Sequence, residues 1–312
     1  MNAPLGLQSL ADAYTANRLS KPDFIEAMAR CHSSWFEYAD FLDGSEVGAI
    51  EIHRGRVVLV TEAGVRFVVD PTDRRQAVCE ALHFRNYEKM DAAMLYALAP
   101  TRGVVFDIGA NRGWYSLHLA RRSPQIQVHA FEPVPHTFAA LQENIRENAT
   151  ANVTPYPFGF SNVKGPADFF FTPGETGAAS AADLLSSPHT RSVKVQLRKL
   201  DDFVAEWGGV IDFIKCDVEG AELFVFQGGL RALESRPIIF CEMLRKWSAK
   251  FDYHPDAIIA LLAEQGYRCF AVDGGRLQAI PHVEETTKQT NFFFLHEIAH
   301  RHVCDTTVPV SV

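Results

Sequence analysis

The sequence lacks the features of a secreted or membrane-spanning protein. None of its six cysteines forms a CxxC pair, and Cys216, Cys241 and Cys269 lie in apolar runs, which is typical of free thiols in a reducing compartment. No window approaches the roughly 20 apolar residues of a membrane helix. The N-terminus has neither a basic start nor a continuous apolar core. We therefore expect a cytoplasmic protein with no membrane span.

An excess of positive charge is also missing. The 312 residues carry a formal net charge of −8, whereas binding to nucleic acid or to an anionic membrane needs a basic surface. With 47% hydrophobic and 22% charged residues, the composition is typical of a globular protein with a full core. We expect no nucleic-acid partner, and leave a homo-oligomer open.

The apolar pattern divides the chain into three parts. Residues 1–85 show helical spacing over 8–40, with Ser20 as the cap of a second helix, followed by three short runs typical of an antiparallel meander. Residues 86–300 alternate apolar strands with amphipathic helices, which predicts a parallel sheet covered on both faces. The last two strands lack a helix between them, so we expect one to run antiparallel at the edge. Residues 301–312 are expected to form a flexible tail.

Several elements can be placed more closely. Helical period runs through residues 76–100, ahead of the first strand of the sheet. An inserted hairpin is expected around a Gly/Ala/Ser-rich loop at 173–188. Further helices are expected over 112–122, 135–149, 220–234 and 254–266.

The stretch VVFDIGANRGWYSLHLA, residues 104–120, ends a buried strand on an acid and glycines and starts a helix at once. This arrangement puts backbone N–H groups where a ligand can approach, and glycine keeps the approach open. The spacing is neither GxGxxG nor that of a phosphate loop. Asp107 favours a ligand that carries positive charge. Trp114, next to the loop, is either a core residue or packs on a cofactor.

The second strand ends in Glu132, which Pro133 follows. An acid at this place accepts hydrogen bonds from ribose hydroxyls, both in dinucleotide sites and in S-adenosylmethionine sites. Together with the glycines of the first loop, Glu132 indicates a nucleoside ligand without choosing between the two cofactors.

The same residues carry a family resemblance. DIGANRGWYS resembles motif I of class I S-adenosylmethionine-dependent methyltransferases, and is similar to the D-x-G-A-N-x-G-x-x-S/T loop of the FkbM family. HAFEPVPHTFAALQENI, RKLDDFV and PIIFCE are similar to further family segments, and IDFIKCDVEGAELFVFQGGLRAL to the run I-K-I-D-V-E-G-A-E. RNYEKMD is similar to the family's Y-E-P but lacks the proline. The resemblance covers residues 86–297.

The resemblance implies a Rossmann-like, seven-stranded, mostly parallel sheet whose last strand is antiparallel. It also implies S-adenosylmethionine as cofactor and methyl transfer to an oxygen, often a hydroxyl of a sugar or natural product. Where the family often has A-L-S-D, this chain has FGFSN, a departure at the adenine contacts. The implied cofactor-binding residues are Asp107, Gly109, Ala110, Asn111, Gly113, Glu132, Pro133, Gly159, Phe160, Ser161 and Asp217.

A hydroxyl acceptor must lose a proton, so an O-methyltransferase needs a base or a metal. Asp217 and Glu219 follow the buried strand IDFIKC, with Lys215 on the same face as Asp217, and Glu242 ends the next strand. A carboxylate between a buried strand and a cleft can have a raised pKa and act as base. We therefore predict Asp217, Glu219 and Glu242 as catalytic residues.

Other roles remain open for these acids. The three predicted catalytic carboxylates could hold Mg²⁺ through oxygen ligands, but no D-x-D pair supports this, and we assign no metal ligand. Glu219 could instead cap the following helix, where acids are favourable. Glu222 is expected on a helix surface or in an ion pair.

Two other classes of function are weighed against methyl transfer to oxygen. An NAD-dependent oxidoreductase would use a similar sheet, but the missing GxGxxG and the acid in the loop argue against it. A non-catalytic protein on a degenerate methyltransferase scaffold is disfavoured because the glycines, Glu132 and the carboxylates occur together. Methylation of nitrogen is a variant that needs less help from a base.

Overall fold

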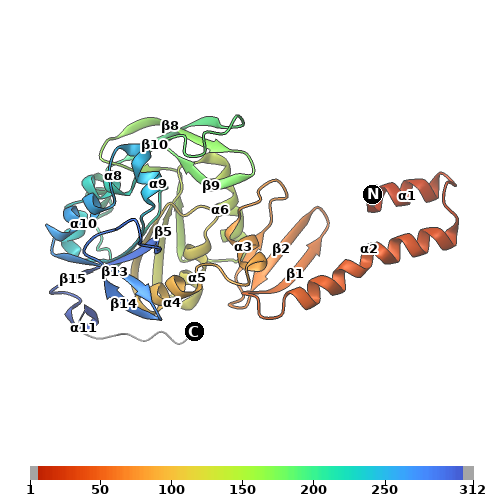
Figure 1. The fold of residues 1–312 in the computed structure, drawn as a ribbon, viewed down its shortest axis with the longest axis horizontal. Helices are drawn as coiled ribbons and strands as arrows, with labels where there is room; N and C mark the ends of the chain where they lie inside the picture. The colour runs from red at the N-terminus through yellow and green to blue at the C-terminus, as the bar shows by residue number, and fades with distance from the viewer. Residues whose placement is uncertain (1–5, 305–312) are drawn as a thin grey trace.

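The structure is a computed structural model that describes residues 6–304. The chain begins with two helices, α1 (Leu7–Thr15) and α2 (Lys21–Phe41), which project from the body of the molecule (Figure 1). Ser20 caps α2 as predicted, because its hydroxyl accepts a hydrogen bond from the backbone N–H of Asp23 at 3.3 Å. The predicted meander is also confirmed, as an antiparallel sheet of β1 (Val47–His53), β2 (Arg56–Thr61) and β3 (Arg66–Val68).

The helical segment predicted over residues 76–100 is two helices, α3 (Ala77–His83) and α4 (Lys89–Leu98). The chain turns between them with Arg85 and Glu88 at positive φ, 73° and 50°. The helical spacing of apolar residues continues across this turn, so the sequence pattern did not separate the two helices. The turn brings Glu88 to the start of β15, where Asn291 Nδ2 donates to it at 3.0 Å.

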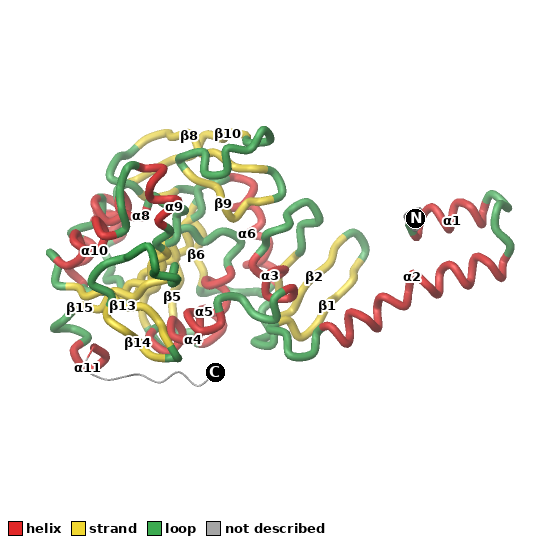
Figure 2. Tube along the Cα trace, viewed as in Figure 1, coloured by secondary structure: helices red, strands yellow, loops and turns green. Residues whose placement is uncertain are grey.

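The main sheet has eight strands and is mostly parallel, which confirms the predicted class I methyltransferase-like arrangement. Figure 2 shows it inside a covering of helices. Its strands, in spatial order, are β14 (Arg276–Ala279), β13 (Tyr267–Asp273), β15 (Asn291–His296), β12 (Ile238–Glu242), β11 (Phe213–Cys216), β4 (Gly103–Ile108), β5 (Ile126–Phe131) and β6 (Val153–Tyr156).

One expectation about the sheet edge is wrong. The last strand, β15, is antiparallel as predicted, but it lies between β12 and β13 and not at the edge. The edge is formed by β14, an eighth strand that pairs with β13 through a tight turn at Gly274 and Gly275. This insertion of β15 lets Asn291 sit opposite Glu242 in the sheet.

Both faces of the sheet are covered, because successive side chains along a strand enter different cores. Val105 belongs to one buried cluster and Phe106 to the other. Leu59 and Phe67 of the meander share the cluster of Val105, so the meander and the main sheet pack into one core. The remaining helices are α5 (Trp114–Arg122), α6 (Pro135–Glu147), α7 (Leu200–Trp207), α8 (Glu222–Gln227), α9 (Arg245–Ser248), α10 (Asp256–Ala263) and α11 (Arg301–Cys304), with 3-10 turns η1 (Ala232–Ser235) and η2 (Ala249–Phe251).

The predicted helix over 220–234 is interrupted. It consists of α8 and η1, and the glycines between them pack closely against other segments. A Cβ on Gly228 would lie 2.2 Å from the carbonyl oxygen of Ser161, and one on Gly229 2.7 Å from Leu200 Cδ2. The chain therefore leaves helical geometry here to pass close to the loop after β7.

The inserted hairpin is larger than predicted. β8 (Gly165–Thr172) and β10 (Arg191–Arg198) pair antiparallel, which confirms the hairpin. Within the segment expected to be a loop, β9 (Glu175–Ser180) adds a strand, and β7 (Gly159–Phe160) completes a four-stranded sheet in the order β7-β10-β8-β9. This second sheet lies above the strand ends of the main sheet (Figure 1).

Two sequence expectations concern the ends and the membrane. Within residues 6–304 we find no helix that is both long and apolar enough to cross a membrane. Of the predicted tail, residues 301–304 form α11, and the rest lies outside the described residues.

Candidate active site

The loop after β4 is folded tightly against its neighbours. Gly109 has φ 76°, and a Cβ there would lie 1.8 Å from the carbonyl oxygen of Asp217, so only glycine fits. The N–H groups of Gly109 and Ala110 both donate to the carbonyl of Phe131, at 3.0 and 2.9 Å. The sequence had indicated that these amides are open to a ligand. In the structure both are instead hydrogen-bonded within the protein. Gly113, with φ 90°, starts α5 against the Leu141 side chain.

Glu132 links this loop to the end of β5 through hydrogen bonds of its side chain. Its two carboxylate oxygens accept hydrogen bonds from the backbone N–H groups of Asn111, at 3.0 Å, and Val134, at 2.9 Å. The side chain is 6% exposed. Burial raises the pKa of Glu132 to about 7, although its two backbone hydrogen bonds work in the opposite direction. Each oxygen keeps a second lone pair for a hydroxyl donor.

Glu132 opens onto a small, mostly apolar pocket of about 90 Å³. The other residues predicted to hold the cofactor's nucleoside end, Pro133, Gly159, Phe160 and Ser161, line the same pocket. Its apolar walls suit a flat ring, and they include Val134, Phe169, Leu197, Phe224 and Phe251.

A buried lysine lies between the first loop and the end of β11. Lys215 Nζ donates to the carbonyl of Gly109 at 2.7 Å and lies 3.4 Å from Asp107 Oδ1 and 3.2 Å from Asp217 Oδ2. Burial alone would lower the pKa of Lys215, but the charges of Asp217 and Asp107 outweigh it and raise the pKa, so the amine stays charged. Lys215 and Asp217 were predicted to share a face of the strand, and their contact agrees with this.

Asp107 is fully buried, and one oxygen of its carboxylate accepts a hydrogen bond within the protein while the other lies near Lys215 without a hydrogen bond. Ser116 Oγ donates to it at 2.5 Å, and the positive charge expected beside it is that of Lys215. This geometry favours a role in holding Lys215 over direct contact with a ligand.

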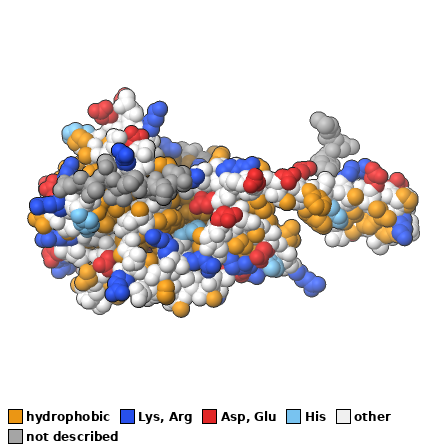
Figure 3. Space-filling view, turned by 90° about the horizontal axis from the view of Figure 1, so that it is seen from below, with side chains coloured by type: hydrophobic (Ala, Val, Ile, Leu, Met, Phe, Trp, Pro, Cys, Tyr) orange, Lys and Arg blue, Asp and Glu red, His pale blue; other side chains and the backbone are white. Residues whose placement is uncertain are grey.

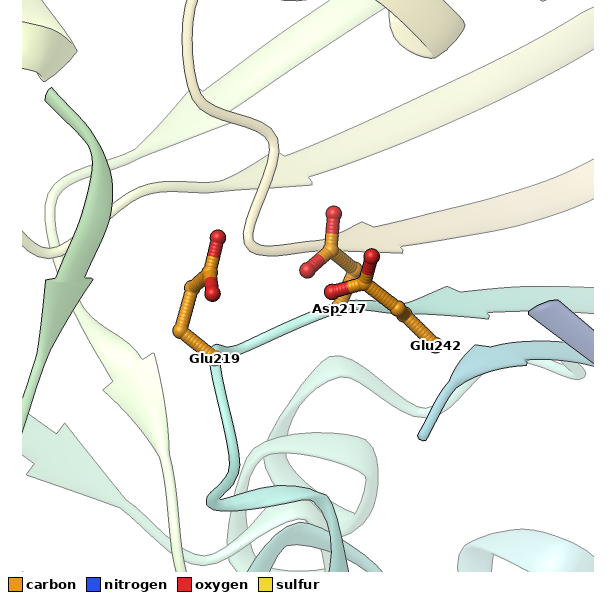
Figure 4. Close-up of side chains that lie close together, drawn as sticks. All are labelled: Asp217, Glu219 and Glu242. Carbon is orange, nitrogen blue, oxygen red and sulfur yellow. The ribbon is translucent and has the colours of Figure 1, made fainter. Parts of the chain in front are cut away.

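The three predicted catalytic carboxylates come together (Figure 4). An oxygen from each of Asp217, Glu219 and Glu242 lies within 4.8 Å of the others. Burial, followed by the nearby charge of Asp217, raises the pKa of both Glu219 and Glu242 well above the usual range. Lys215 partners Asp217, so the cluster combines one carboxylate beside a cation with two whose pKa is raised.

A second, larger pocket of about 360 Å³ adjoins the first. Gly109, Asn111, Asp217 and Glu219 line both pockets, whereas Ala110 and Glu242 line the larger one. The residues shared by the two pockets therefore mark the place where a ligand in one would meet a ligand in the other.

Sequence reasoning missed several residues of the larger pocket. Glu88 accepts hydrogen bonds from the Tyr115 hydroxyl and from Asn291 Nδ2, the latter at 3.0 Å, and burial raises its pKa. Tyr87 lies beside it against Trp114, with ring centroids 5.3 Å apart. The signal was present in the partial Y-E-P match, which points to Tyr87 and Glu88. From the meander side the pocket is lined by Phe67, Val68, Arg75, Gln76 and Phe84.

The structure decides three expectations about single residues. Glu222 is 1% exposed and not on a helix surface. Its carboxylate accepts from the backbone N–H groups of Val218 and Gly220, each at 3.0 Å, so it shapes the turn that presents Glu219. The N-cap position of α8 is occupied by Ala221, so Glu219 is not its cap. Trp114 is 5% exposed and stacks on Phe67 in the core, while also lining the larger pocket.

The chain matches the profile described as "Methyltransferase FkbM domain" over residues 107–269. The protein belongs to this family. The match includes the loop after β4, Glu132, and all three clustered carboxylates, and it confirms the family predicted from the sequence.

The chain is also similar to three curated relatives. The chain is 34% identical to the hexuronic acid methyltransferase AglP of Haloferax volcanii, with 45% of this chain and 55% of the relative covered. It is 33% identical to the 31-O-demethyl-FK506 methyltransferase FkbM of Streptomyces tacrolimicus, with 40% and 58% covered. It is 30% identical to the 2-O-methyltransferase NoeI of Sinorhizobium fredii, with 45% and 62% covered. The chain thus spans less than two thirds of the length of these relatives.

Among solved structures, the fibrillarin of Aeropyrum pernix, in complex with natively bound S-adenosyl-L-methionine, is 10% identical with a TM-score of 0.36. That comparison covers 80% of this chain and 99% of the fibrillarin chain.

Proposed function

We propose that the protein transfers a methyl group from S-adenosylmethionine to a hydroxyl oxygen of a sugar, glycan or natural-product acceptor. One observation carries this proposal: two adjoining pockets, one apolar with Glu132 at its wall and one larger, share Asp217 and Glu219. Two pockets that meet at acidic groups suit a reaction that joins a nucleoside cofactor to a second substrate. The relatives named for O-methyl transfer and for a hexuronic acid support the same reaction class.

The smaller pocket would hold the nucleoside end of the cofactor. Glu132 would accept hydrogen bonds from the ribose hydroxyls, since each of its oxygens keeps a free lone pair. Phe160 and Phe224 offer apolar contact to the adenine. Asn111 and Asp217, which line both pockets, would flank the methionine end.

The chemistry requires alignment and the removal of one proton. S-adenosylmethionine supplies a methyl group on a positively charged sulfur. The protein's part is to hold the acceptor oxygen in line with that methyl, and such positioning contributes roughly 7–11 kcal/mol in well-ordered sites. Glu219 or Glu242, in its carboxylate form once the cationic cofactor is bound, would take the hydroxyl proton, because the raised pKa of each makes it a stronger base than an ordinary carboxylate.

The N-terminal part would help to bind the acceptor. Residues 1–85 contribute Phe67, Arg75 and Phe84 to the larger pocket, and Phe84 is 70% exposed at its rim. An exposed aromatic ring beside polar groups suits the apolar face of a sugar. We therefore assign acceptor contacts to residues 1–85 and cofactor binding and catalysis to residues 86–300.

We expect methyl transfer to proceed without magnesium. The three clustered carboxylates lie close enough together to share a cation, but Lys215 already places a positive charge 3.2 Å from Asp217. We expect methyl transfer to persist in excess EDTA. Loss of activity that Mg²⁺ restores would instead assign the cluster to a metal.

Calorimetric titration with S-adenosylmethionine, S-adenosylhomocysteine and NAD tests the proposal. We expect the first two to bind and Glu132→Gln to weaken both at least tenfold. Glu222→Gln is the matched control, since Glu222 is equally buried, accepts two backbone N–H groups and has a pKa of about 7, yet lies outside the pocket wall. Binding of NAD, or of none of the three, would overturn the proposal.

A further inference from the structure

The N-terminal arm, defined as α1 and α2 together, is poorly covered by the rest of the chain. Not one residue of the 21-residue α2 is buried, and in α1 only Leu10 is. Figure 3 shows hydrophobic side chains along this projecting arm. Of the twelve large hydrophobic side chains that are exposed in residues 6–304, seven lie in the arm: Leu7, Tyr14, Ile25, Trp35, Phe36, Tyr38 and Phe41. This density of exposed apolar groups is typical of an interaction surface.

One face of α2 is already used by α1. Tyr14 stacks on Phe24 with ring centroids 4.6 Å apart. The nine residues of α1 span about 14 Å, whereas α2 spans about 32 Å. α1 therefore covers only part of the length of α2, on the side that carries Phe24.

An adjacent face of α2 is open along its length. Ile25 and Phe36 are 57% and 73% exposed. They are eleven residues apart, which is close to three helical turns, so they lie on the same face. Between them a shallow groove runs past Ala29 and Ser33, whose small side chains permit close approach of another helix.

The charges of the arm are unevenly distributed along its length. Over residues 18–30 three cations, Arg18, Lys21 and Arg30, outnumber Asp23 and Glu26 by one. Over residues 31–43 the charged residues are acidic, namely Glu37, Asp40 and Asp43. Acids at a helix C-terminus oppose the helix dipole, and α2 has no basic residue in its last turn. In an antiparallel pair these acids would face the basic, dipole-positive end of the other helix.

We infer that the arm is the interface between two copies of this chain, with the α2 helices antiparallel about a two-fold axis near residues 30 and 31. In this register Ile25 packs against Phe36 of the partner subunit, and Lys21 faces Asp40 of the partner subunit. A two-fold pairing repeats each contact. It removes the most exposed apolar side chains of α2 from water and leaves the active site of each body open.

Sedimentation equilibrium of the full chain tests the interface. We expect a species of twice the chain mass at tens of micromolar protein, and a shift of at least tenfold in its dissociation constant for Ile25→Glu with Phe36→Glu. The matched control is Ile52→Glu with Val163→Glu, which alters two exposed side chains, 70% and 59% exposed, outside the arm. A wild-type monomer at 100 µM, or a dimer that the control weakens as much as the arm variant, would overturn the inference.

Charge reversal tests the orientation. Asp40→Lys with Asp43→Lys makes both ends of α2 basic, and Arg18→Glu with Lys21→Glu makes both acidic. If the dimer is antiparallel, the dissociation constant of each variant alone should be at least tenfold higher than that of the wild type. An equimolar mixture of the two variants should restore dimers. Parallel pairing predicts that the first variant dimerises best with wild type, and that outcome would contradict the antiparallel arrangement.

Discussion

The ammonium group of Lys215 lies 3.2 Å from the carboxylate of Asp217 and donates to the carbonyl of Gly109 at 2.7 Å. This contact joins the loop after β4 to the carboxylate cluster after β11. One buried cation thus fixes the two segments between which the proposed methyl transfer would take place, and it offsets the charge of Asp107 as well.

Replacing Lys215 by Met should strongly destabilise the fold. The substitution leaves Asp107 fully buried and Asp217 half-buried without their cation, and breaking a buried pair in this way costs about 3–5 kcal/mol. Urea unfolding measures the change. Lys194→Met is the control, because its pair with Asp168 is 73% and 49% exposed, and it should cost less than about 1 kcal/mol. Equal losses in the two variants would show that Lys215 has no special structural role.

Binding of S-adenosylmethionine should release protons. The pKa values of Glu219 and Glu242 are raised well above the usual range, so both groups bind their protons more strongly than ordinary carboxylates do. A bound sulfonium cation would lower both pKa values, and S-adenosylhomocysteine has no such charge. We therefore expect more proton release with S-adenosylmethionine, and an affinity for it that rises with pH.

Calorimetry in two buffers of different ionisation enthalpy measures this release at one pH. The double variant Glu219→Gln with Glu242→Gln should remove the difference between the two ligands. The same release for both ligands in the wild type would argue that the carboxylates do not sense the sulfonium.

Glu222 should make stability depend on pH. Burial raises its pKa from 4.5 to about 7 in the folded protein, so the folded state keeps a proton that the unfolded state loses. The contribution of Glu222 to the free energy of unfolding is complete below pH 4.5. It is lost as the pH rises towards 7, by about 3 kcal/mol at most.

Glu222→Gln keeps the acceptor for the two backbone N–H groups and removes the titration. Between pH 5 and pH 8 the free energy of unfolding of the wild type should therefore fall more than that of the variant. Glu206→Gln, at a side chain that is 67% exposed, should leave the wild-type pH dependence in place. A parallel course for wild type and Glu222→Gln would contradict the raised pKa.

The sequence predicted the parts of the site that follow strands directly. Asp217, Glu219 and Glu242 stand at the ends of two apolar runs, and parallel neighbours bring such ends to one edge. Glu132 was identified in the same way. The local pattern is sufficient here because an apolar run followed by polar residues or glycine shows where each strand ends.

The parts that were missed depend on contacts between distant segments. The amides of the first loop are bound by the carbonyl of Phe131, about twenty residues away. Glu222 is buried partly because Tyr253 packs over it, with its hydroxyl 3.3 Å away. Glu88 is held at the site by a hydrogen bond from Asn291, which lies more than two hundred residues later in the chain. No periodicity in the chain encodes these three contacts.

Gly109 and Gly208 form a matched pair for testing the close approach of the first loop to β11. Both have φ 76°, so alanine is strained at either position by about 1–2 kcal/mol. A Cβ on Gly208 meets nothing within 4 Å, whereas one on Gly109 would lie 1.8 Å from the carbonyl oxygen of Asp217. Gly109→Ala must therefore displace backbone as well as strain it.

We expect Gly208→Ala to lose only the strain energy and to bind S-adenosylmethionine like the wild type. Gly109→Ala should lose more stability in urea unfolding, and its cofactor affinity should fall at least tenfold because Asn111 and Asp217 move apart. If the two variants were equally stable and bound the cofactor equally well, the contact between Gly109 and Asp217 would not be what positions the loop.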